Sequence, residues 1–187
     1  MNTVSRAYET FLELVIPEET IVERIIEVAE QIDREYEGKE LLIITILKGS
    51  ICLVADLIRQ LNGPNIVEFI RCSSYGASGH VRGRLRITGL DQLEVEGKDI
   101  LLIDDIFDSG HTLTAVFSRL QELKPASLKT LVLLAKRVPR KVPFQPHFVL
   151  FEIEDRFVVG YGLDYKERFR GLKGVYALLL ENLPQKV

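Results

Sequence analysis

Residues 100–113 read Ile-Leu-Leu-Ile-Asp-Asp-Ile-Phe-Asp-Ser-Gly-His-Thr-Leu, and this stretch decides the expected fold. A short apolar run, Ile100–Ile103, predicts a buried strand that ends in two adjacent carboxylates, and Leu113–Leu123 reads as a helix. A small polar turn joins the two elements. In α/β proteins, charged ligands bind where strands end and helices begin. The stretch therefore predicts an α/β fold with a ligand site at this edge of the sheet.

The small polar turn has the composition of a phosphate-binding loop. Ser109 and Thr112 offer hydroxyl donors, and Gly110 permits a tight turn or a close backbone approach. Free N–H groups and the positive end of the helix dipole favour an anion there. Asp104 and Asp105 would repel a phosphate, so we expect them to serve sugar hydroxyls, a proton or Mg²⁺. Taken singly, each acid of the stretch also has a simpler explanation, as a helix cap or a solvated strand end.

The overall composition describes one globular domain. The chain has 187 residues, of which 47% are hydrophobic and 27% charged, and its net charge is −3. This length provides one substantial core, and the charge gives no indication of binding to nucleic acid or to an anionic membrane. Leu41–Leu47 is the longest apolar run and is too short to span a bilayer, and Met1–Glu19 lacks the apolar core of a signal peptide. Two cysteines outside any CxxC motif lead us to expect a cytoplasmic protein. From the charge and the short apolar runs we expect no nucleic-acid or membrane partner.

Strand and helix patterns alternate along the chain. Strands are expected at 41–47, 67–72, 99–103, 128–135, 148–151 and 157–159, and helices at 18–36, 50–61 and 113–123. The polar segment 73–97 is broken by glycines, and a loop of this length is usually functional or disordered. The alternation predicts a mostly parallel, Rossmann-like central sheet flanked by helices. We expect a single domain with a core of roughly 38–150 and a small hood formed by the terminal segments, about 1–37 and 151–187.

Three further groups have ordinary explanations when each is taken alone. Lys48-Gly49 follows the first apolar run and reads as a strand-to-helix turn with a surface lysine. Ser74-Tyr75 begins the long polar segment and reads as part of a surface loop. Lys136 ends another apolar run, where a solvated lysine is common.

Together, these segments resemble the type I phosphoribosyltransferases, and their purine branch in particular. The family signature is several apolar residues, two acids, two apolar residues and then Asp-Ser/Thr-Gly-x-Thr, which residues 100–112 match. The aromatic-rich segment Asp155–Tyr165 matches a second family block, and the motifs follow in the family's order from Leu47 through Arg170. The chain departs from many relatives at Asp104, where they carry a glutamate, an acid with longer reach.

The resemblance implies a role for individual residues. Asp108 is implied to be the catalytic residue, a general base that accepts the purine N7 proton. The residues implied to bind phosphoribosyl diphosphate are Lys48, Gly49, Ser74, Tyr75, Asp104, Asp105, Asp108, Ser109, Gly110, His111, Thr112 and Arg170. The purine-binding residues would be Lys136, Phe157, Val158 and Asp164, and the Mg²⁺ ligands Asp104, Asp105 and Asp164. The resemblance also allows a cis peptide between Lys48 and Gly49.

The implied reaction belongs to purine salvage. It transfers the phosphoribosyl group of phosphoribosyl diphosphate to hypoxanthine or guanine, with Mg²⁺ as cofactor, and it releases pyrophosphate. The family suggests a homodimer or a homotetramer. A xanthine-preferring enzyme is an alternative, and an RNA-binding regulator on the same fold is another. The purine-reading set of Lys136, Phe157 and Asp164, together with the acidic net charge, opposes the regulator.

Overall fold

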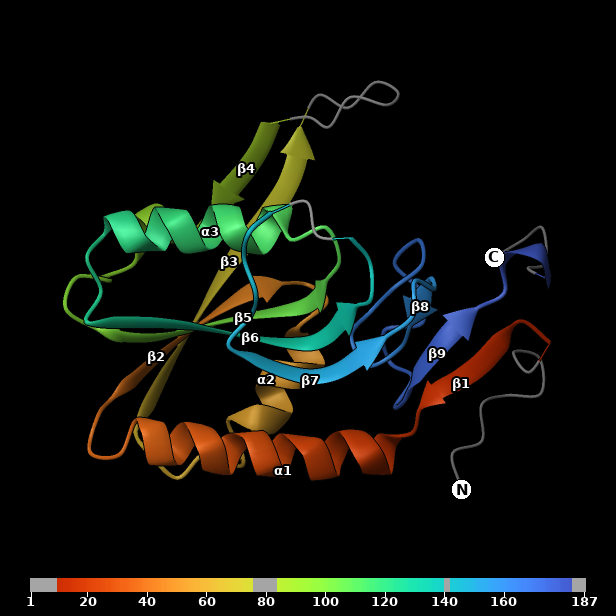
Figure 1. Cartoon of the computed structure of the whole chain (residues 1–187), viewed down its shortest axis with the longest axis horizontal. Helices are drawn as coiled ribbons and strands as arrows, with labels where there is room; N and C mark the ends of the chain where they lie inside the picture. Colours follow the sequence, from red (N-terminus) through yellow and green to blue (C-terminus); the bar gives the residue numbers. More distant parts are fainter. Residues whose placement is uncertain (1–9, 76–83, 140–141, 183–187) are drawn as a thin grey trace.

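The computed structural model describes residues 10–75, 84–139 and 142–182. Over these ranges the chain forms two sheets with helices packed against the larger one (Figure 1). The larger sheet contains, in spatial order, β4 (Arg84–Thr88), β3 (Asn65–Tyr75), β2 (Leu41–Leu47), β5 (Asp99–Phe107), β6 (Ser127–Lys136) and β7 (Phe148–Ile153). The smaller sheet contains β1 (Leu12–Ile16), β9 (Val175–Leu178) and β8 (Val158–Val159). The helices are α1 (Glu18–Glu35), α2 (Ile51–Leu57) and α3 (His111–Glu122), with the short helices η1 (Leu90–Gln92) and η2 (Leu180–Asn182).

The larger sheet is mostly parallel, which confirms the predicted fold class. Strands β3, β2, β5, β6 and β7 pair in parallel, and β4 pairs antiparallel with β3. Leu41 of β2 pairs with Asp99 of β5, which pairs in turn with Ser127 of β6. Because these three strands start in register, their carboxyl ends meet at one edge of the sheet. Each of these strands is followed by a segment that carries predicted site residues.

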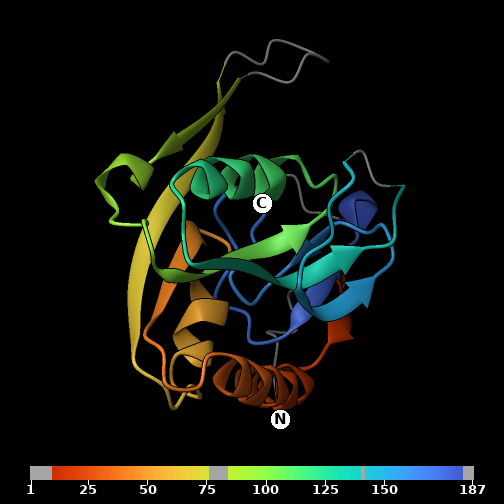
Figure 2. The same ribbon diagram turned by 60° about the vertical axis from the view of Figure 1, so that its left-hand side comes forward.

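The central strands are buried on both faces, as their continuous apolar runs predict. Ile100 through Ile103 have no exposed surface. Leu101 and Ile103 face the apolar layer beneath α1 and α2, whereas Ile100 and Leu102 face the layer beneath α3. Figure 2 shows the same arrangement from a second direction, with α1 and α3 on opposite sides of the sheet.

The smaller sheet joins the two ends of the chain. Leu12 of β1 pairs with Leu178 of β9, and Val158 of β8 pairs with Ala177 of β9. In Figure 1 this sheet lies beyond the carboxyl ends of β6 and β7. The predicted division into core and hood stays a prediction, and α1, which falls inside the predicted hood range, packs on the larger sheet. No helix within the described parts of the chain has the length and apolarity needed to cross a membrane.

The predicted boundaries that differ most from the structure are those of β5, of the loop 73–97 and of the helix 50–61. β5 does not end before its two acids but continues to Phe107, because pairing with β6 through Phe107 and Ala135 satisfies the backbone there. The predicted loop 73–97 contains the end of β3, all of β4 and η1, since the polar segment pairs as a hairpin. The predicted helix 50–61 ends earlier, at Leu57, and turns follow it.

Candidate active site

Two carboxylates lie near the carboxyl end of β5, one almost fully buried. Asp104 is 7% exposed, and its Oδ1 accepts a hydrogen bond from the backbone N–H of Asp105 at 3.0 Å. Asp105 Oδ1 accepts from the N–H of Ile106 at 2.7 Å. Burial raises the pKa of Asp104 well above its ordinary value, and the neighbouring carboxylate of Asp105 raises it further. Burial also raises the pKa of Asp105, although the hydrogen bond with Asp104 and the charge of Arg170 oppose that rise. Two adjacent acids that resist ionisation together are suited to a cation or to sugar hydroxyls.

Asp104→Asn should make the protein more stable near neutral pH. The pKa of Asp104 is higher in the folded protein than in the unfolded chain, so the folded state holds its proton to a higher pH. The free energy of unfolding therefore falls as the pH rises from the unfolded pKa to the folded pKa. Asparagine removes that loss while its amide oxygen keeps the acceptor for the Asp105 N–H. We expect the melting temperature to rise by about 2–4 °C for each kcal/mol recovered. Thermal unfolding at about pH 7.5 and about pH 4 tests this, because the gain should vanish near the pKa of about 3.9 of an unfolded aspartate. An Asp91→Asn control should behave like the wild type at both pH values, and an unchanged or lower melting temperature for Asp104→Asn at neutral pH would contradict the expectation.

The turn between β5 and α3 is shaped by Gly110. This residue is the N-cap of α3 and has a φ of 81°, a left-handed conformation that favours glycine. A Cβ there would come within 2.9 Å of the Phe107 ring and 2.5 Å of Val142. Gly110 occupies the cap position of α3, and Asp108 and Ser109 precede it. The N–H groups and the positive dipole end of the first turn of α3 favour an anion at this place.

The other residues of this turn surround the helix N-terminus. Asp108 is exposed, Ser109 and Thr112 are half-buried, and His111 is the exposed first residue of α3. The structure thus brings the whole predicted phosphate-binding set to one place, directly after the two buried carboxylates of β5.

The turn after β2 packs against the acids of β5. Gly49 is buried, and a side chain at this position would collide with the Asp105 carboxylate. Lys48 is exposed, with its Nζ 2.8 Å from Glu167 Oε2. The peptide bond between Leu47 and Lys48 is cis. The resemblance allowed a cis bond one residue later, between Lys48 and Gly49, and the sequence carries no local signal for either position because none of these residues is a proline.

The segment 160–170, which we name the hood loop after the predicted hood, lies against this turn. Gly160, Tyr161 and Gly162 have φ values of 96°, 49° and 97°. A Cβ on Gly162 would collide with the carbonyl oxygen of Gly49, so the two glycines allow the loop and the turn to touch. The buried Tyr161 donates from its hydroxyl to Asp56 Oδ2 at 2.6 Å, which ties the loop to α2.

Arg170 organises the polar side of the hood loop. Its Nη1 donates to the carbonyl oxygen of Gly162 at 2.8 Å, and its Nη2 lies 2.7 Å from Asp164 Oδ1. Asp164 Oδ2 accepts from the backbone N–H of Glu167 at 2.8 Å. The Nε atom of Arg170 is buried and has no hydrogen-bond partner in the described structure. The positive charge of Arg170 also lies close enough to Asp105 to oppose the rise in the pKa of that carboxyl.

The predicted purine-binding residues Lys136, Phe157 and Val158 lie at the end of β6 and at the start of β8. Lys136 ends β6 with a side chain that is 13% exposed, and its Nζ lies 2.9 Å from Asp155 Oδ1. Phe157 is 46% exposed. The centroid of its ring lies 5.7 Å from that of Tyr165, in an edge-to-face arrangement. Val158 is buried in β8. An anchored ammonium and an exposed aromatic face are suited to the polar edge and to the flat face of a base.

Some predicted groupings are not seen among the described residues. Over residues 10–75, 84–139 and 142–182, no three Asp, Glu, His or Cys side chains gather closely enough to hold a metal by themselves. Asp164 contacts Arg170, so the three predicted acids do not form a closed protein cage. Ser74 and Tyr75 lie at the end of β3, paired with Leu85 and Arg84, and residues 76–83 of the predicted loop 73–97 lie outside the described residues.

Sequence reasoning missed three residues of this site. Tyr161, Asp56 and Glu167 act through contacts with residues far away in the chain, and no local pattern marks such pairs. The two glycines that flank Tyr161 were the available signal, because paired glycines indicate an unusual backbone.

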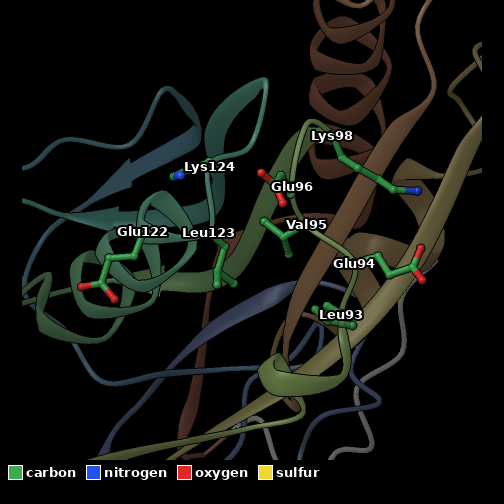
Figure 3. Close-up of a pocket in the computed structure, with 8 residues that line it drawn as sticks. All are labelled: Leu93, Glu94, Val95, Glu96, Lys98, Glu122, Leu123 and Lys124. Carbon is green, nitrogen blue, oxygen red and sulfur yellow. The ribbon is translucent and has the colours of Figure 1, made fainter.

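A surface cavity of about 510 Å³ lies elsewhere, between the end of α3 and the segment that leads into β5. Figure 3 shows the residues that line it, which are Leu93, Glu94, Val95, Glu96, Lys98, Glu122, Leu123 and Lys124. It lies by the start of β5, at the opposite end of the strand from the acids. No predicted site residue lines this cavity.

Comparison with known proteins agrees with this geometry. Residues 17–166 match the family model described as a phosphoribosyl transferase domain. The chain is 41% identical to the hypoxanthine-guanine phosphoribosyltransferase of Aquifex aeolicus, over 88% of this chain and 93% of that protein. It is 40% identical to the hypoxanthine phosphoribosyltransferase of Salmonella typhimurium, over 90% of this chain and 96% of that protein.

Solved structures show the same fold. A ternary substrates complex of a variant hypoxanthine phosphoribosyltransferase from Trypanosoma cruzi superposes with a TM-score of 0.86 at 38% identity, covering 93% of this chain and 98% of that chain. A hypoxanthine-guanine phosphoribosyltransferase from Bacillus anthracis superposes with a TM-score of 0.84 at 36% identity, covering 90% of this chain and 99% of that chain.

Proposed function

The chain belongs to the phosphoribosyl transferase family, and from this premise we propose that it is a purine-salvage enzyme. It transfers the 5-phosphoribosyl group of phosphoribosyl diphosphate to hypoxanthine or guanine, which gives IMP or GMP and pyrophosphate. The observation that carries the proposal is the meeting of three motifs at one sheet edge. Lys48-Gly49 follows β2, Asp104-Asp105 lie near the end of β5, and Lys136 ends β6.

The 5-phosphate is assigned to the turn before α3. Ser109 and Thr112 supply hydroxyls, and the first turn of α3 supplies N–H groups and the positive end of its dipole. Asp104 and Asp105 hold the ribose hydroxyls, for which a pair of carboxylates provides acceptors. This arrangement fixes the sugar with its anomeric carbon between the diphosphate and the base.

The diphosphate is assigned to the opposite wall. Lys48 and Arg170 supply positive charge, and the backbone of Gly49 approaches closely because it carries no side chain. When the bond between the anomeric carbon and the diphosphate oxygen breaks, positive charge develops on the sugar and negative charge on the leaving group. Fixed cations placed where that charge develops stabilise the transition state.

The base is assigned to the side of the site formed by Lys136 and the segment 157–164. Lys136 donates to the 6-oxo group, Phe157 covers one face of the ring, and the backbone near Val158 and Asp164 reads the remaining edge. As the purine N9 bonds to the anomeric carbon, its N7 proton becomes acidic. Asp108 accepts that proton as general base.

The acids of the site fit Mg²⁺. The raised pKa values of Asp104 and Asp105 reflect burial of two adjacent carboxylates, and a divalent cation nearby would relieve their repulsion. Asp104, Asp105 and Asp164 would hold the ion together with substrate oxygens and water, which suits an ion that keeps several waters. When bound, Mg²⁺ neutralises the charge of the departing diphosphate.

Removal of the metal should abolish turnover. We expect no nucleotide formation in excess EDTA, and full recovery when Mg²⁺ or Mn²⁺ is added beyond the chelator. Circular dichroism in EDTA provides the control, since the described core is apolar and should stay folded without metal. Full turnover in excess EDTA would remove the basis for assigning a metal to these acids.

One assay tests the proposed reaction itself. Phosphoribosyl diphosphate and hypoxanthine should be consumed in equal amounts, with IMP and pyrophosphate formed in the same ratio. IMP formation is followed by chromatography and pyrophosphate by a coupled phosphate assay. Absence of IMP with every purine base offered would overturn the proposal.

The assembly and the location of the protein are also proposals. Ile51 and Phe69 expose 48% and 47% of their surface, which supports a homodimer or a homotetramer that covers them. Cys52 and Cys72 are free thiols, which supports the cytoplasm as the location.

A further inference from the structure

One carboxylate oxygen lies against both cations that are assigned to the diphosphate. Glu167 Oε2 is 2.8 Å from Lys48 Nζ and 3.2 Å from Arg170 Nη2. Lys48 reaches it from the turn after β2, and Arg170 reaches it from the hood loop. A negative charge of this chain therefore lies between the two positive charges that the proposed reaction offers to the diphosphate.

The backbone places Glu167 in this position. Tyr165 and Arg168 exchange two backbone hydrogen bonds, of 3.1 and 3.0 Å, which close a tight turn around Lys166 and Glu167. Lys166 and Glu167 both adopt left-handed conformations, with φ values of 50° and 63°. The N–H of Glu167 donates to Asp164 Oδ2 at 2.8 Å. The carboxylate thus stands on a defined turn that is held at both ends.

The carboxyl group of Glu167 is ionised at physiological pH. Hydrogen bonds from Lys48 and Arg170 lower the pKa of its carboxyl, and the charges of both cations act in the same direction. The side chain is exposed to solvent, so it can swing away from the cations without disturbing the core.

We propose that Glu167 is an internal counter-anion, which holds Lys48 and Arg170 in the free protein and is displaced when the diphosphate enters. This inference rests on the proposed function, because that function assigns the two cations to the diphosphate. A diphosphate carries more negative charge than one carboxylate, so it wins the exchange by Coulomb attraction. The exchange weakens diphosphate binding by the free energy of the displaced pairs. As pyrophosphate leaves, the Glu167 carboxylate pairs again with the two cations, which favours release of the product.

The simpler explanation is a passive surface ion pair. The side chains of Lys48 and Glu167 are 54% and 64% exposed, and exposed pairs of this kind often contribute little to stability. The two explanations differ in what they predict for a ligand. A passive pair leaves pyrophosphate affinity unchanged when the carboxylate is neutralised, whereas a counter-anion weakens that affinity.

The test is pyrophosphate binding to Glu167→Gln, measured by isothermal titration calorimetry with saturating Mg²⁺. Glutamine keeps the size and removes the charge, so we expect the dissociation constant to fall by about three- to tenfold. The gain should shrink at about 0.5 M salt, where charges are screened beyond a few ångströms. Glu27→Gln is the matched control, because Glu27 is an exposed glutamate that pairs with Arg24 at 2.6 Å on α1. That control should bind pyrophosphate like the wild type.

Two further variants separate failure of this inference from failure of the proposed function. Lys48→Ala and Arg170→Ala should each weaken pyrophosphate binding, and on the Lys48→Ala background the effect of Glu167→Gln should be smaller. If both cations matter but Glu167→Gln binds like the wild type, the counter-anion role is overturned and the proposed function stands. If neither cation affects pyrophosphate binding, the diphosphate assignment fails, and this inference fails with it.

Discussion

Hypoxanthine and guanine should be used with a kcat/KM about 10⁴-fold higher than that of adenine. Lys136 has only hydrogen-bond donors. The 6-oxo group of hypoxanthine or guanine accepts from such a donor, whereas adenine presents an amino group at the same position. Two donors would then face each other in a site from which water is excluded, and neither would have a partner.

The environment of Lys136 sharpens this selection. Asp155 lies 2.9 Å from its Nζ, and the lysine side chain is only 13% exposed, so the ammonium is held in place. An ammonium has three donors, and the contact with Asp155 leaves others for the base. A pre-positioned donor discriminates better than a mobile one, because it cannot turn away from the wrong partner.

The measurement compares kcat/KM for hypoxanthine, guanine, xanthine and adenine in the wild type and in Lys136→Ala. The variant should lose most of its activity with hypoxanthine. Lys39→Ala is the control, since Lys39 also pairs with an aspartate, Asp99, but at the far end of β5. Guanine's 2-amino group needs acceptors that the backbone near Val158 and Asp164 can supply, so xanthine should be the poorer oxopurine. Adenine turnover comparable to that of hypoxanthine would refute the assignment, as would undiminished hypoxanthine activity in Lys136→Ala.

Asp108→Asn should lower kcat by about 10²- to 10⁴-fold while phosphoribosyl diphosphate still binds. Asparagine cannot accept the N7 proton at its amide, so the general base is lost. The phosphate-binding turn should survive, because its shape depends on Gly110 and on the N-terminus of α3. Asp108 is exposed at the surface of this turn, and asparagine has nearly the same size and shape as aspartate.

Single-turnover kinetics measure the chemical step, and calorimetry measures phosphoribosyl diphosphate binding. Asp91→Asn is the control, because Asp91 is an exposed aspartate on η1. An unchanged single-turnover rate in Asp108→Asn would show that this carboxylate is not the base. Loss of binding together with loss of rate would instead assign Asp108 to holding the substrate.

The elements predicted most accurately are those whose own residues decide their structure. The apolar run Leu41–Leu47 forms β2 at the predicted residues, since a strand buried on both faces needs a continuous apolar sequence. The periodic helix 18–36 forms α1 from Glu18 to Glu35 for a similar reason. The turn from Asp108 to Thr112 was found because small and polar residues at a strand-to-helix junction carry a chemical meaning of their own.

The features that were missed depend on distant partners. β1 and β9 are short and pair with each other from opposite ends of the chain, so neither has a convincing pattern alone. The hydrogen bond from Tyr161 to Asp56 and the ion pair between Lys48 and Glu167 have the same character. Sequence patterns describe which face of an element is apolar. They do not say which loop will contact which turn, as the loop around Gly162 contacts the turn at Gly49.

The pairing of β1 with β9 has a consequence for synthesis of the protein on the ribosome. Among the strands of the described structure, β1 emerges first and its partner β9 emerges last, so β1 must wait until Val175–Leu178 has been made. The strands of the larger sheet all lie at or before Ile153, so they can pair earlier. Until Val175–Leu178 leaves the exit tunnel, the apolar side chains of Phe11 and Leu12 lack Tyr176 and Leu178 of their cluster and are targets for chaperones. A nascent chain cut before Val175 should therefore hold the phosphate-binding turn but be recognised by quality control as unfinished.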